Sequence, residues 1–407
     1  MRRAVAESFL LILIALGACS PALAEKRMVV IDQDTSGPGG SNIMSMMALL
    51  QSPQVDVLGI TVVTGNAWRD DEARHALRML ELIGRTDVPV ALGAVFPLIR
   101  TQEETRLMVP LVGKVAWLGA WGQKLSTLPP MPGLVEPPAP PAPLGPWDTP
   151  PLAEGEPHTK PIAEDAAHFL IRQVRAHPHQ VTIYAAGPLT DIALAIALDP
   201  HFAELSQGLV VMGGSLDPHS DDPEFSTSPR HEFNFWFDPE AARITLRAHW
   251  PRIDLTTVDV SIKAMFTEQM LAAISKSPNP AAQYIAKYSQ ERYYLWDELA
   301  ACAWLDPSII TRREDLYMDV DVSHGPTYGE TLSWIEALKP AIDLQRVHAQ
   351  VDLDLPRFTR MFVELMSAPT PRAGPAAQRE GPAAQRGGSA AQRGGSAAQR
   401  EGPAAQR

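Results

Sequence analysis

The sequence predicts an α/β fold with an open, mostly parallel central sheet that is flanked by helices. The first observation is a set of short, nearly continuous apolar runs at 29–31, 55–63 and 181–185. Such runs are typical of parallel strands that are buried on both faces. The second observation is that segments with apolar residues at helical spacing, such as 70–83, follow these runs. Because strands and helices alternate, the pattern favours one parallel sheet over separate helical and strand regions.

The individual elements follow from the same two patterns. The expected strands are apolar runs that end in polar or glycine-containing turns, and they are 29–31, 55–63, 88–92, 181–185, 208–212 and 253–255. The expected helices have apolar residues at i, i+3 and i+4, and they are 43–50, 70–83, 163–175, 189–198, a helix that begins at Asp238-Pro239, and 281–304. At that helix start, Asp is the expected cap and Pro occupies the first turn.

Composition limits the class of protein. With 407 residues and 45% hydrophobic content, the chain can bury one large core or two smaller ones. Its formal net charge is −12, whereas binding to a nucleic-acid backbone needs clustered Lys and Arg. We therefore expect no nucleic-acid partner. Of the two cysteines, Cys302 lies alone in an apolar helical segment, where core packing is the expected role.

Residues 1–24 have the pattern of an export signal. A basic start is followed by an apolar stretch at 9–16 that is too short to span a bilayer, and 22–24 (Ala-Leu-Ala) offers a cleavage site. A competing interpretation is a bacterial lipoprotein signal, because Leu-Gly-Ala precedes Cys19 and resembles a lipobox. We expect a periplasmic or secreted protein, and the lipobox would add a lipid anchor at Cys19.

Two low-complexity segments lie outside the expected core. The tail, 370–407, contains a seven-residue repeat rich in Gly, Ala and Gln that has no bulky residues for a coiled-coil seam, so we expect it to be disordered. The segment 129–151 has Pro at nearly every second or third position and is expected to form an extended insert. The folded domain is therefore expected to span 26–369.

Two carboxylates follow the first expected strand. Asp32 and Asp34 lie at its carboxyl end, and a Gly/Pro/Ser loop separates them from the first expected helix. In open α/β sheets, ligands bind beyond the carboxyl ends of the strands. Carboxylates at this place suit metal ligation or general acid/base catalysis. An Asp-rich turn that caps a helix is the structural alternative.

Five motifs in chain order resemble those of the inosine-uridine preferring nucleoside hydrolases. They are DQD after the first strand, TVVTGN after the second, YAAGPLTDIALA in the middle of the chain, EFNFWFDPEAA further on, and WDELAA in the last expected helix. The resemblance covers residues 28 to 305 and, more loosely, the chain up to the repeats. It implies the fold inferred above, a nucleoside as small-molecule substrate, and hydrolysis of the N-glycosidic bond.

The resemblance also implies a Ca²⁺ site and assigns roles to individual residues. The implied ligands and neighbours of the ion are Asp32, Asp34, Asn42, the carbonyl of Ala186, and Asp297, and Asp34 is also the implied base that activates water. The implied sugar contacts are Asn66, Glu232 and Asn234. All these ligands are oxygen atoms, which suits a hard cation.

The chain departs from the family pattern at several of these positions. Where the family has two adjacent aspartates, this chain has Ser41 and Asn42, after a loop that is three residues longer. Calcium affinity is therefore expected to be lower. Ser226 stands where many members have a sugar-binding Asn, and Trp296 stands where some members have a His. An indole cannot act as a general acid, but it can stack on a base, which favours a purine.

Some of these residues also have structural interpretations. Glu232 and Asn234 precede an aromatic run and could form a plain strand edge, and Asp191 could cap the helix that follows it. Four tryptophans could line a base pocket, although packing in the core or at its rim is favoured for each; they are Trp68, Trp117, Trp121 and Trp236.

The sequence thus predicts an exported, calcium-dependent nucleoside hydrolase in which Asp34 is catalytic. The contacts expected for substrate are Ser41, Asn66, Ser226, Glu232, Asn234 and Trp296. A non-catalytic protein that binds nucleosides or ribose is the alternative that the loss of acid at Ser41 and Asn42 leaves open, and a hydrolase of another riboside is a third. Family members are often oligomers, so a homo-oligomer is expected on that ground alone.

Overall fold

The computed structural model describes residues 26–112, 117–122, 144–216, 231–290 and 292–371. The expected signal segment, the repeat tail from residue 372, most of the Pro-rich segment and Ser226 lie outside these ranges. None of the helices in the described part of the chain has the length and apolar character needed to cross a bilayer.

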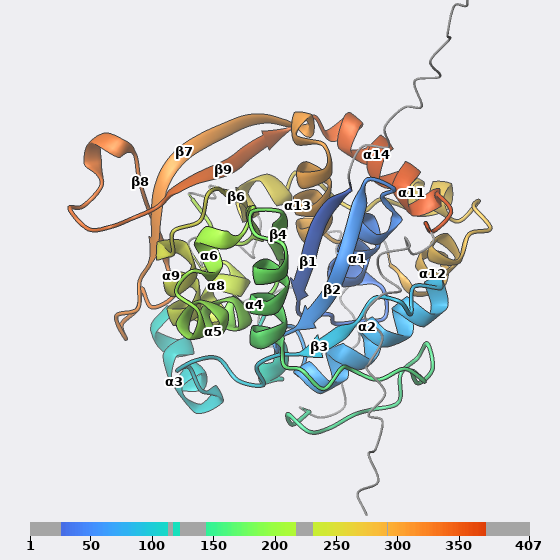
Figure 1. The fold of residues 1–407 in the computed structure, drawn as a ribbon, viewed down its shortest axis with the longest axis horizontal. Helices are drawn as coiled ribbons and strands as arrows, with labels where there is room; N and C mark the ends of the chain where they lie inside the picture. The colour runs from blue at the N-terminus through green and yellow to red at the C-terminus, as the bar shows by residue number, and fades with distance from the viewer. Residues whose placement is uncertain (1–25, 113–116, 123–143, 217–230, 291, 372–407) are drawn as a thin grey trace, which may run out of the picture.

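A nine-stranded sheet with the order β3-β2-β1-β4-β5-β6-β9-β7-β8 organises the molecule (Figure 1). The strands are β1 (Arg27–Gln33), β2 (Val55–Val62), β3 (Val90–Leu92), β4 (Val181–Ala185), β5 (Gly208–Met212), β6 (Ile253–Thr256), β7 (Ile310–Val320), β8 (Thr331–Trp334) and β9 (Arg346–Leu353). All pairs from β3 to β9 in this order are parallel, and β7 pairs antiparallel with β9 and β8. The expected open, mostly parallel sheet is confirmed.

Helices cover both faces of the sheet. The described helices of eight residues or more are α1 (Gly40–Gln51), α2 (Arg69–Ile83), α3 (Gln102–Val112), α4 (Ala166–Ala176), α5 (Thr190–Leu198), α9 (Pro239–Arg247), α12 (Pro280–Tyr288), α13 (Trp296–Leu305) and α14 (Leu355–Ser367). The shorter ones are α6 (Phe202–Leu205), α8 (Phe233–Phe237), α10 (Val258–Ser261) and α11 (Glu268–Ile274). One buried core joins α1, α2 and α11 to α14 to the sheet, and a second joins α4, α5, α6 and α9 to its other face.

Alternating side chains of the strands divide between these two cores. In β1, Val29 and Ile31 belong to the core under α1, while Val30 belongs to the core under α4. All three are fully buried, as expected for a parallel strand that is covered on both sides. The apolar run that predicted this strand therefore positions Asp32 and Asp34 at the carboxyl edge of the sheet.

One predicted helix, 281–304, is wrong as a single element. The structure has two helices, α12 and α13, and the segment between them pairs with the chain near Phe266. The backbone N–H of Phe266 donates to the carbonyl of Tyr293 at 2.8 Å, and the N–H of Leu295 donates to that of Ala264 at 2.7 Å. These bonds satisfy backbone groups that a continuous helix would have used internally. The interruption places the start of α13, and hence Asp297, at the carboxyl edge of the sheet.

Candidate active site

A hydrogen-bonded cluster of Asp34, Asn42 and Asp297 lies at the carboxyl end of β1. Asn42, in the first turn of α1, donates from Nδ2 to Oδ1 of Asp34 at 2.8 Å and to Oδ2 of Asp297 at 3.1 Å. Three separate elements, the loop after β1, α1 and α13, supply these side chains. The structure therefore brings together residues that are more than 250 positions apart in the chain.

Gln33 holds this cluster together, and the sequence interpretation missed it. Its Nε2 donates to Oδ2 of Asp297 and to Oγ of Ser45, both at 3.1 Å. Its Oε1 accepts from the backbone N–H of Asp34 at 3.0 Å and from Nδ2 of Asn42 at 3.2 Å. The available signal was a long polar residue at the end of an apolar strand, because a buried amide needs specific partners.

Asn66 joins the cluster from the turn after β2. Its backbone N–H donates to Oδ2 of Asp34 at 2.8 Å, and its Nδ2 donates to Oδ1 of Asn42 at 3.3 Å. Its own Oδ1 accepts from Nε1 of Trp117 at 2.6 Å. Trp117 is 39% exposed, so its indole reaches from the surface to a polar group of the cluster.

Two glycines leave the space that the carboxylate of Asp34 occupies. A Cβ atom on Gly65 would lie 2.2 Å from Oδ2 of Asp34, and one on Gly187 would lie 2.8 Å from its backbone nitrogen. Gly187 directly follows Ala186, whose carbonyl is an implied metal ligand, at the end of β4. Asp34 is thus confined between the ends of β2 and β4.

Replacement of Gly65 by Ala should displace Asp34 and impair folding. The added methyl would overlap Asp34 and Pro188, and overpacking of this kind costs about 1–3 kcal/mol. Chemical denaturation would measure the loss of unfolding free energy, and an activity assay would report the displaced carboxylate. Gly325→Ala is the matched control, because no atom lies within 4 Å of the corresponding Cβ position. Equal stability of the two variants would contradict the proposed confinement.

The carboxylates of the cluster are buried close to one another. Burial raises the pKa of Asp34, and the neighbouring charge of Asp297 raises it further. Burial also raises the pKa of Asp297, to about 8, and Glu232 contributes in the same direction. No cationic side chain is among the causes of these two shifts. A bound cation would therefore lower the free energy of the ionised cluster.

Stability of the metal-free protein should fall as pH rises from about 4 to about 8. In an unfolded chain an Asp titrates near 4, but Asp297 titrates at about 8 in the folded chain, so the folded state binds its proton more tightly. The resulting stabilisation is fully present below the unfolded pKa and is lost through the folded pKa. Calorimetry in the presence of a chelator would measure the slope of Tm against pH, and Asp297→Asn should flatten it. A slope unchanged by this substitution would contradict the assignment.

Glu232 caps a helix rather than forming a strand edge. Its Oε1 accepts from the N–H of Asn234 at 2.8 Å, and its Oε2 accepts from those of Phe235 at 3.1 Å and Gly214 at 2.9 Å. The strand-edge alternative for Glu232 and Asn234 is therefore wrong. The first N–H groups of α8 have no partner within the helix, and the carboxylate of Glu232 accepts from them. Asn234 is buried and donates from Nδ2 to the carbonyl of Met212 at 3.1 Å.

Asp32 faces a different set of groups from Asp34. Its Oδ1 accepts from the hydroxyl of Thr61 at 2.5 Å, and burial together with Asp191 raises its pKa. Asp191 does not act as a helix cap, contrary to expectation: it lies within the first turn of α5 and accepts from the N–H of Ala94 at 2.7 Å. Asp32 therefore lies beneath the cluster, in contact with β2 and α5.

Ser41 connects α1 to α13. Its Oγ accepts from the N–H of Asp297 at 3.1 Å and donates to Oε2 of Glu298 at 2.5 Å. Glu298 is fully buried and was not singled out from the sequence, where it could not be told from an ordinary helical charge. Trp296 is half-buried beside Tyr294, with 5.5 Å between ring centroids.

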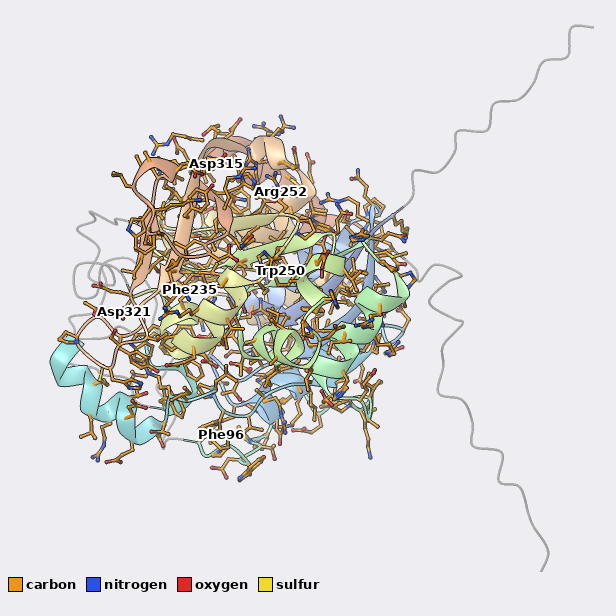
Figure 2. The ribbon with its side chains drawn as sticks, turned by 60° about the vertical axis from the view of Figure 1, so that its left-hand side comes forward. Phe96, Phe235, Trp250, Arg252, Asp315 and Asp321 are labelled. Carbon is orange, nitrogen blue, oxygen red and sulfur yellow. The ribbon has the colours of Figure 1, made fainter. Side chains whose placement is uncertain are left out.

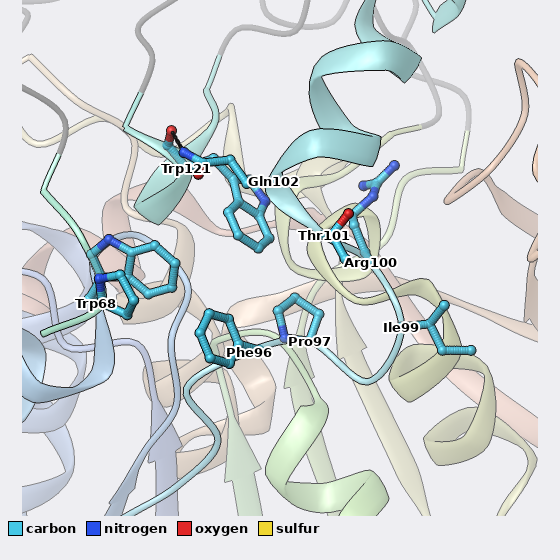
Figure 3. Close-up of a pocket in the computed structure, with 9 residues that line it drawn as sticks. Trp68, Phe96, Pro97, Ile99, Arg100, Thr101, Gln102 and Trp121 are labelled. Atoms are coloured by element: carbon cyan, nitrogen blue, oxygen red, sulfur yellow. Dashed lines mark hydrogen bonds between the residues drawn. The ribbon is translucent and has the colours of Figure 1, made fainter.

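An aromatic cavity of about 340 Å³ lies beside the turn that carries Asn66 (Figure 3). Trp68, Phe96 and Trp121 line it, and the two indoles meet edge to face with centroids 5.7 Å apart. Trp68, Trp121 and Trp236 are buried in one small core cluster, so the expected packing role is confirmed for these three. Gln102 closes one side through a bond from Nε2 to the carbonyl of Trp121 at 2.8 Å.

Oxygen-containing side chains dominate the cluster. Within the described ranges, no group of three or more His, Cys, Asp and Glu side chains is arranged to hold a metal ion. Asp34 and Asp297 are the two carboxylates that meet at Asn42, so a cation here would also need amide or carbonyl oxygens. The site is chemically suited to bind a polyhydroxylated sugar and to accept a proton from water.

The fold and the polar cluster define an α/β protein with a candidate small-molecule site at the carboxyl edge of its parallel sheet. The family described as "Inosine-uridine preferring nucleoside hydrolase" matches residues 29–360. This chain belongs to that family, and the predicted nucleoside hydrolase is confirmed.

Named relatives agree with the family assignment. The chain is 28% identical over 364 residues to a probable uridine nucleosidase 2 of Arabidopsis thaliana, with 84% of this chain and 98% of that protein covered. It is 27% identical to a pyrimidine-specific ribonucleoside hydrolase RihA of Shewanella sp. (strain MR-7), with 75% and 86% covered.

Solved structures share the fold. A plant nucleoside hydrolase, PpNRh1, superposes with a TM-score of 0.63 at 24% identity, covering 84% of this chain and 99% of that one. A purine-preferring ribonucleoside hydrolase from Gardnerella vaginalis superposes with a TM-score of 0.64 at 22% identity, covering 84% and 98%.

Proposed function

We propose that this protein hydrolyses the N-glycosidic bond of ribonucleosides with Asp34 as the base and with Ca²⁺ in the carboxylate cluster. The observation that carries this proposal is the meeting of Asp34, Asn42 and Asp297 around one point at the carboxyl edge of the sheet. Such a cluster supplies negative charge where an oxocarbenium-like transition state develops positive charge.

The donor chemistry of the cluster fits calcium. Asp34, Asp297, the amide oxygen of Asn42 and the carbonyl of Ala186 would hold the ion, and their oxygen atoms match its preference. Asp34 and Asp297 are buried, and no cationic side chain is among the causes of their pKa shifts. A bound cation would therefore stabilise their ionised forms. When bound, Ca²⁺ makes a coordinated water more acidic and orients it toward the sugar.

The residues of this chain would perform the remaining steps. Asp34 takes the proton of the attacking water at Oδ1 or Oδ2. Gln33 positions the two acidic residues, because it accepts from the backbone N–H of Asp34 and donates to Oδ2 of Asp297. Asn66 and Asn234 would bind the sugar hydroxyls, since an amide can both donate to and accept from a vicinal diol. The carboxylate of Glu232 would place negative charge near the ribose ring, where the transition state develops positive charge.

We propose a purine as the preferred base, because the half-buried indole of Trp296 offers a large face for stacking. The two sequence relatives named above are named for uridine and pyrimidines, whereas one of the solved structures is named as purine-preferring. Stacking on Trp296 predicts faster hydrolysis of purine nucleosides, and the names of the sequence relatives predict faster hydrolysis of pyrimidine nucleosides. Incubation of the purified full chain with inosine, guanosine, uridine and cytidine, with Ca²⁺ or with a chelator, tests them together. Ribose release that requires Ca²⁺ supports the mechanism, and faster release from the purines supports Trp296 as the stacking residue.

A non-catalytic nucleoside-binding protein is the second candidate. It is favoured by one observation: the amide Nδ2 of Asn42 donates to both carboxylates of the cluster, where the family has an acid. Calorimetry would distinguish the two functions, because binding heat without any released ribose would support the second candidate and overturn the first.

Export, either as a free protein or with a lipid anchor at Cys19, and a homo-oligomer are further parts of the proposal. They rest on the N-terminal sequence pattern and on the resemblance alone. Cell fractionation followed by mass spectrometry of the mature N-terminus would distinguish cleavage after Ala24 from acylation of Cys19. Light scattering of the mature protein would measure its oligomeric state.

A further inference from the structure

A second cavity, of about 510 Å³, lies at the opposite edge of the sheet from the carboxylate cluster. Its walls come from the amino ends of β1, β4, β5 and β6 and from the end of α13, and they include Arg27, Thr182, Gln207, Arg252, Trp304 and Arg313. Figure 2 labels Arg252 at the upper end of the molecule and Phe96, from the aromatic cavity, at the lower end. The volume lies within the range of small-molecule sites.

The cavity has an excess of positive charge in a chain whose net charge is −12. Arg252 is neutralised by Asp254, with Nε 2.5 Å from Oδ2. Arg27 and Arg313 have no carboxylate within salt-bridge distance among the described residues. Two guanidinium groups therefore line the cavity without an anion to balance them.

These two arginines are held in place by neutral groups. The guanidinium of Arg27 lies 3.7 Å from the ring centroid of Trp304, and its Nη1 donates to the carbonyl of Leu305 at 3.4 Å. Arg313 donates from Nη2 to the carbonyl of Pro307 at 2.6 Å, while its Nε is buried without a hydrogen-bond partner. Each guanidinium group is thus held by one backbone carbonyl and keeps further N–H groups that can donate. An oxyanion can accept hydrogen bonds from these N–H groups.

Neutral side chains of the sheet add hydrogen-bond donors to those of Arg27 and Arg313. The Oε1 atom of Gln350 accepts from the hydroxyl of Thr256 at 2.9 Å, which leaves its Nε2 group to donate. Gln350, Gln207 and the hydroxyl-bearing Thr182 all line the cavity. A ligand with several acceptor oxygens would meet donors from both the sheet and α13.

We propose that this cavity binds a phosphate monoester of metabolite size, with its phosphate between Arg27 and Arg313. A phosphate is favoured over a single carboxylate because it carries up to two charges and three acceptor oxygens, matching two unbalanced guanidinium groups. The remaining volume of the cavity accommodates the body of the ligand. The site is separate from the carboxylate cluster and requires none of its residues.

Isothermal titration calorimetry of the full chain tests this proposal, with inorganic phosphate and ribose 5-phosphate as probes. The buffer must contain no Ca²⁺, since calcium phosphate would precipitate. We expect binding with a Kd of about 1 mM or tighter, with ribose 5-phosphate binding more tightly than inorganic phosphate. Binding should persist in Asp34→Asn, because the site does not include the carboxylate cluster.

Two charge-removing variants and a matched control complete the test. Arg313→Gln and Arg27→Gln should each weaken phosphate binding by about ten-fold or more. Arg312→Gln is the control: it removes the same charge one residue away, at an exposed position of β7 that does not line the cavity, and should bind as the wild type does. Circular dichroism confirms that each variant is folded. No binding to the wild type, or equal weakening in all three variants, would overturn the proposal.

Discussion

Asp34→Asn should abolish measurable ribohydrolase activity while leaving the protein folded. The substitution keeps the shape of the side chain but removes the proton acceptor, and loss of a general base costs about 100- to 10,000-fold in rate. Besides burial, the charges of Asp297 and Glu232 both raise the pKa of Asp34, so removal of its carboxylate also relieves repulsion between buried charges. We therefore expect Tm in a chelator to be equal to that of the wild type or higher.

Ribose release and thermal unfolding measure the two parts of this prediction separately. Asp56→Asn is a suitable control because Asp56 lies near the amino end of β2, paired in register with Met28 and far along the strands from the site. Activity retained in Asp34→Asn would remove the assignment of Asp34 as the base. Lost activity together with a large fall in Tm would instead indicate a structural role for the carboxylate.

The fold was predictable because its strands are buried on both faces. The runs 29–31 and 181–185 correspond to β1 and β4, and side chains from both belong to the two cores on opposite faces. The break between α12 and α13 was not predictable from periodicity, because it is stabilised by backbone bonds to the distant segment near Phe266. Tertiary hydrogen bonds of this kind override the local helical pattern.

The site was predictable only in part, for a related reason. Residues at strand ends, such as Asp34 and Asn66, could be placed at one edge of the sheet because parallel strands share their direction. The contacts that orient them depend on α1 and α13, which approach the cluster from elsewhere in the fold. Gln33 and Glu298 acquire their roles through these contacts: the position of Gln33 at the end of an apolar strand signals a buried amide but not its partners, and no local pattern identifies Glu298.

Asn42→Asp should make the stability of the protein strongly dependent on calcium. Asn42 donates from Nδ2 to Asp34 at 2.8 Å and to Asp297 at 3.1 Å, and a carboxylate there would replace two hydrogen bonds by repulsion. In a chelator, we therefore expect Tm to fall below that of the wild type. With Ca²⁺ present, the added charge should tighten binding by about ten-fold or more, because affinity rises with the number of charged oxygen ligands.

Thermal unfolding across a Ca²⁺ titration measures both effects in one experiment, since a ligand that binds the folded state raises Tm by mass action. Asn279→Asp is the matched control, because among the described residues the side chain of Asn279 bonds to Ser277 and Ser367, outside the site. An unchanged response to Ca²⁺ in Asn42→Asp would show that no cation occupies the cluster. In that case, the hydrogen bonds from the amide of Asn42 would have taken over the charge-balancing role, and hydrolysis by Asp34 would have to proceed without a metal.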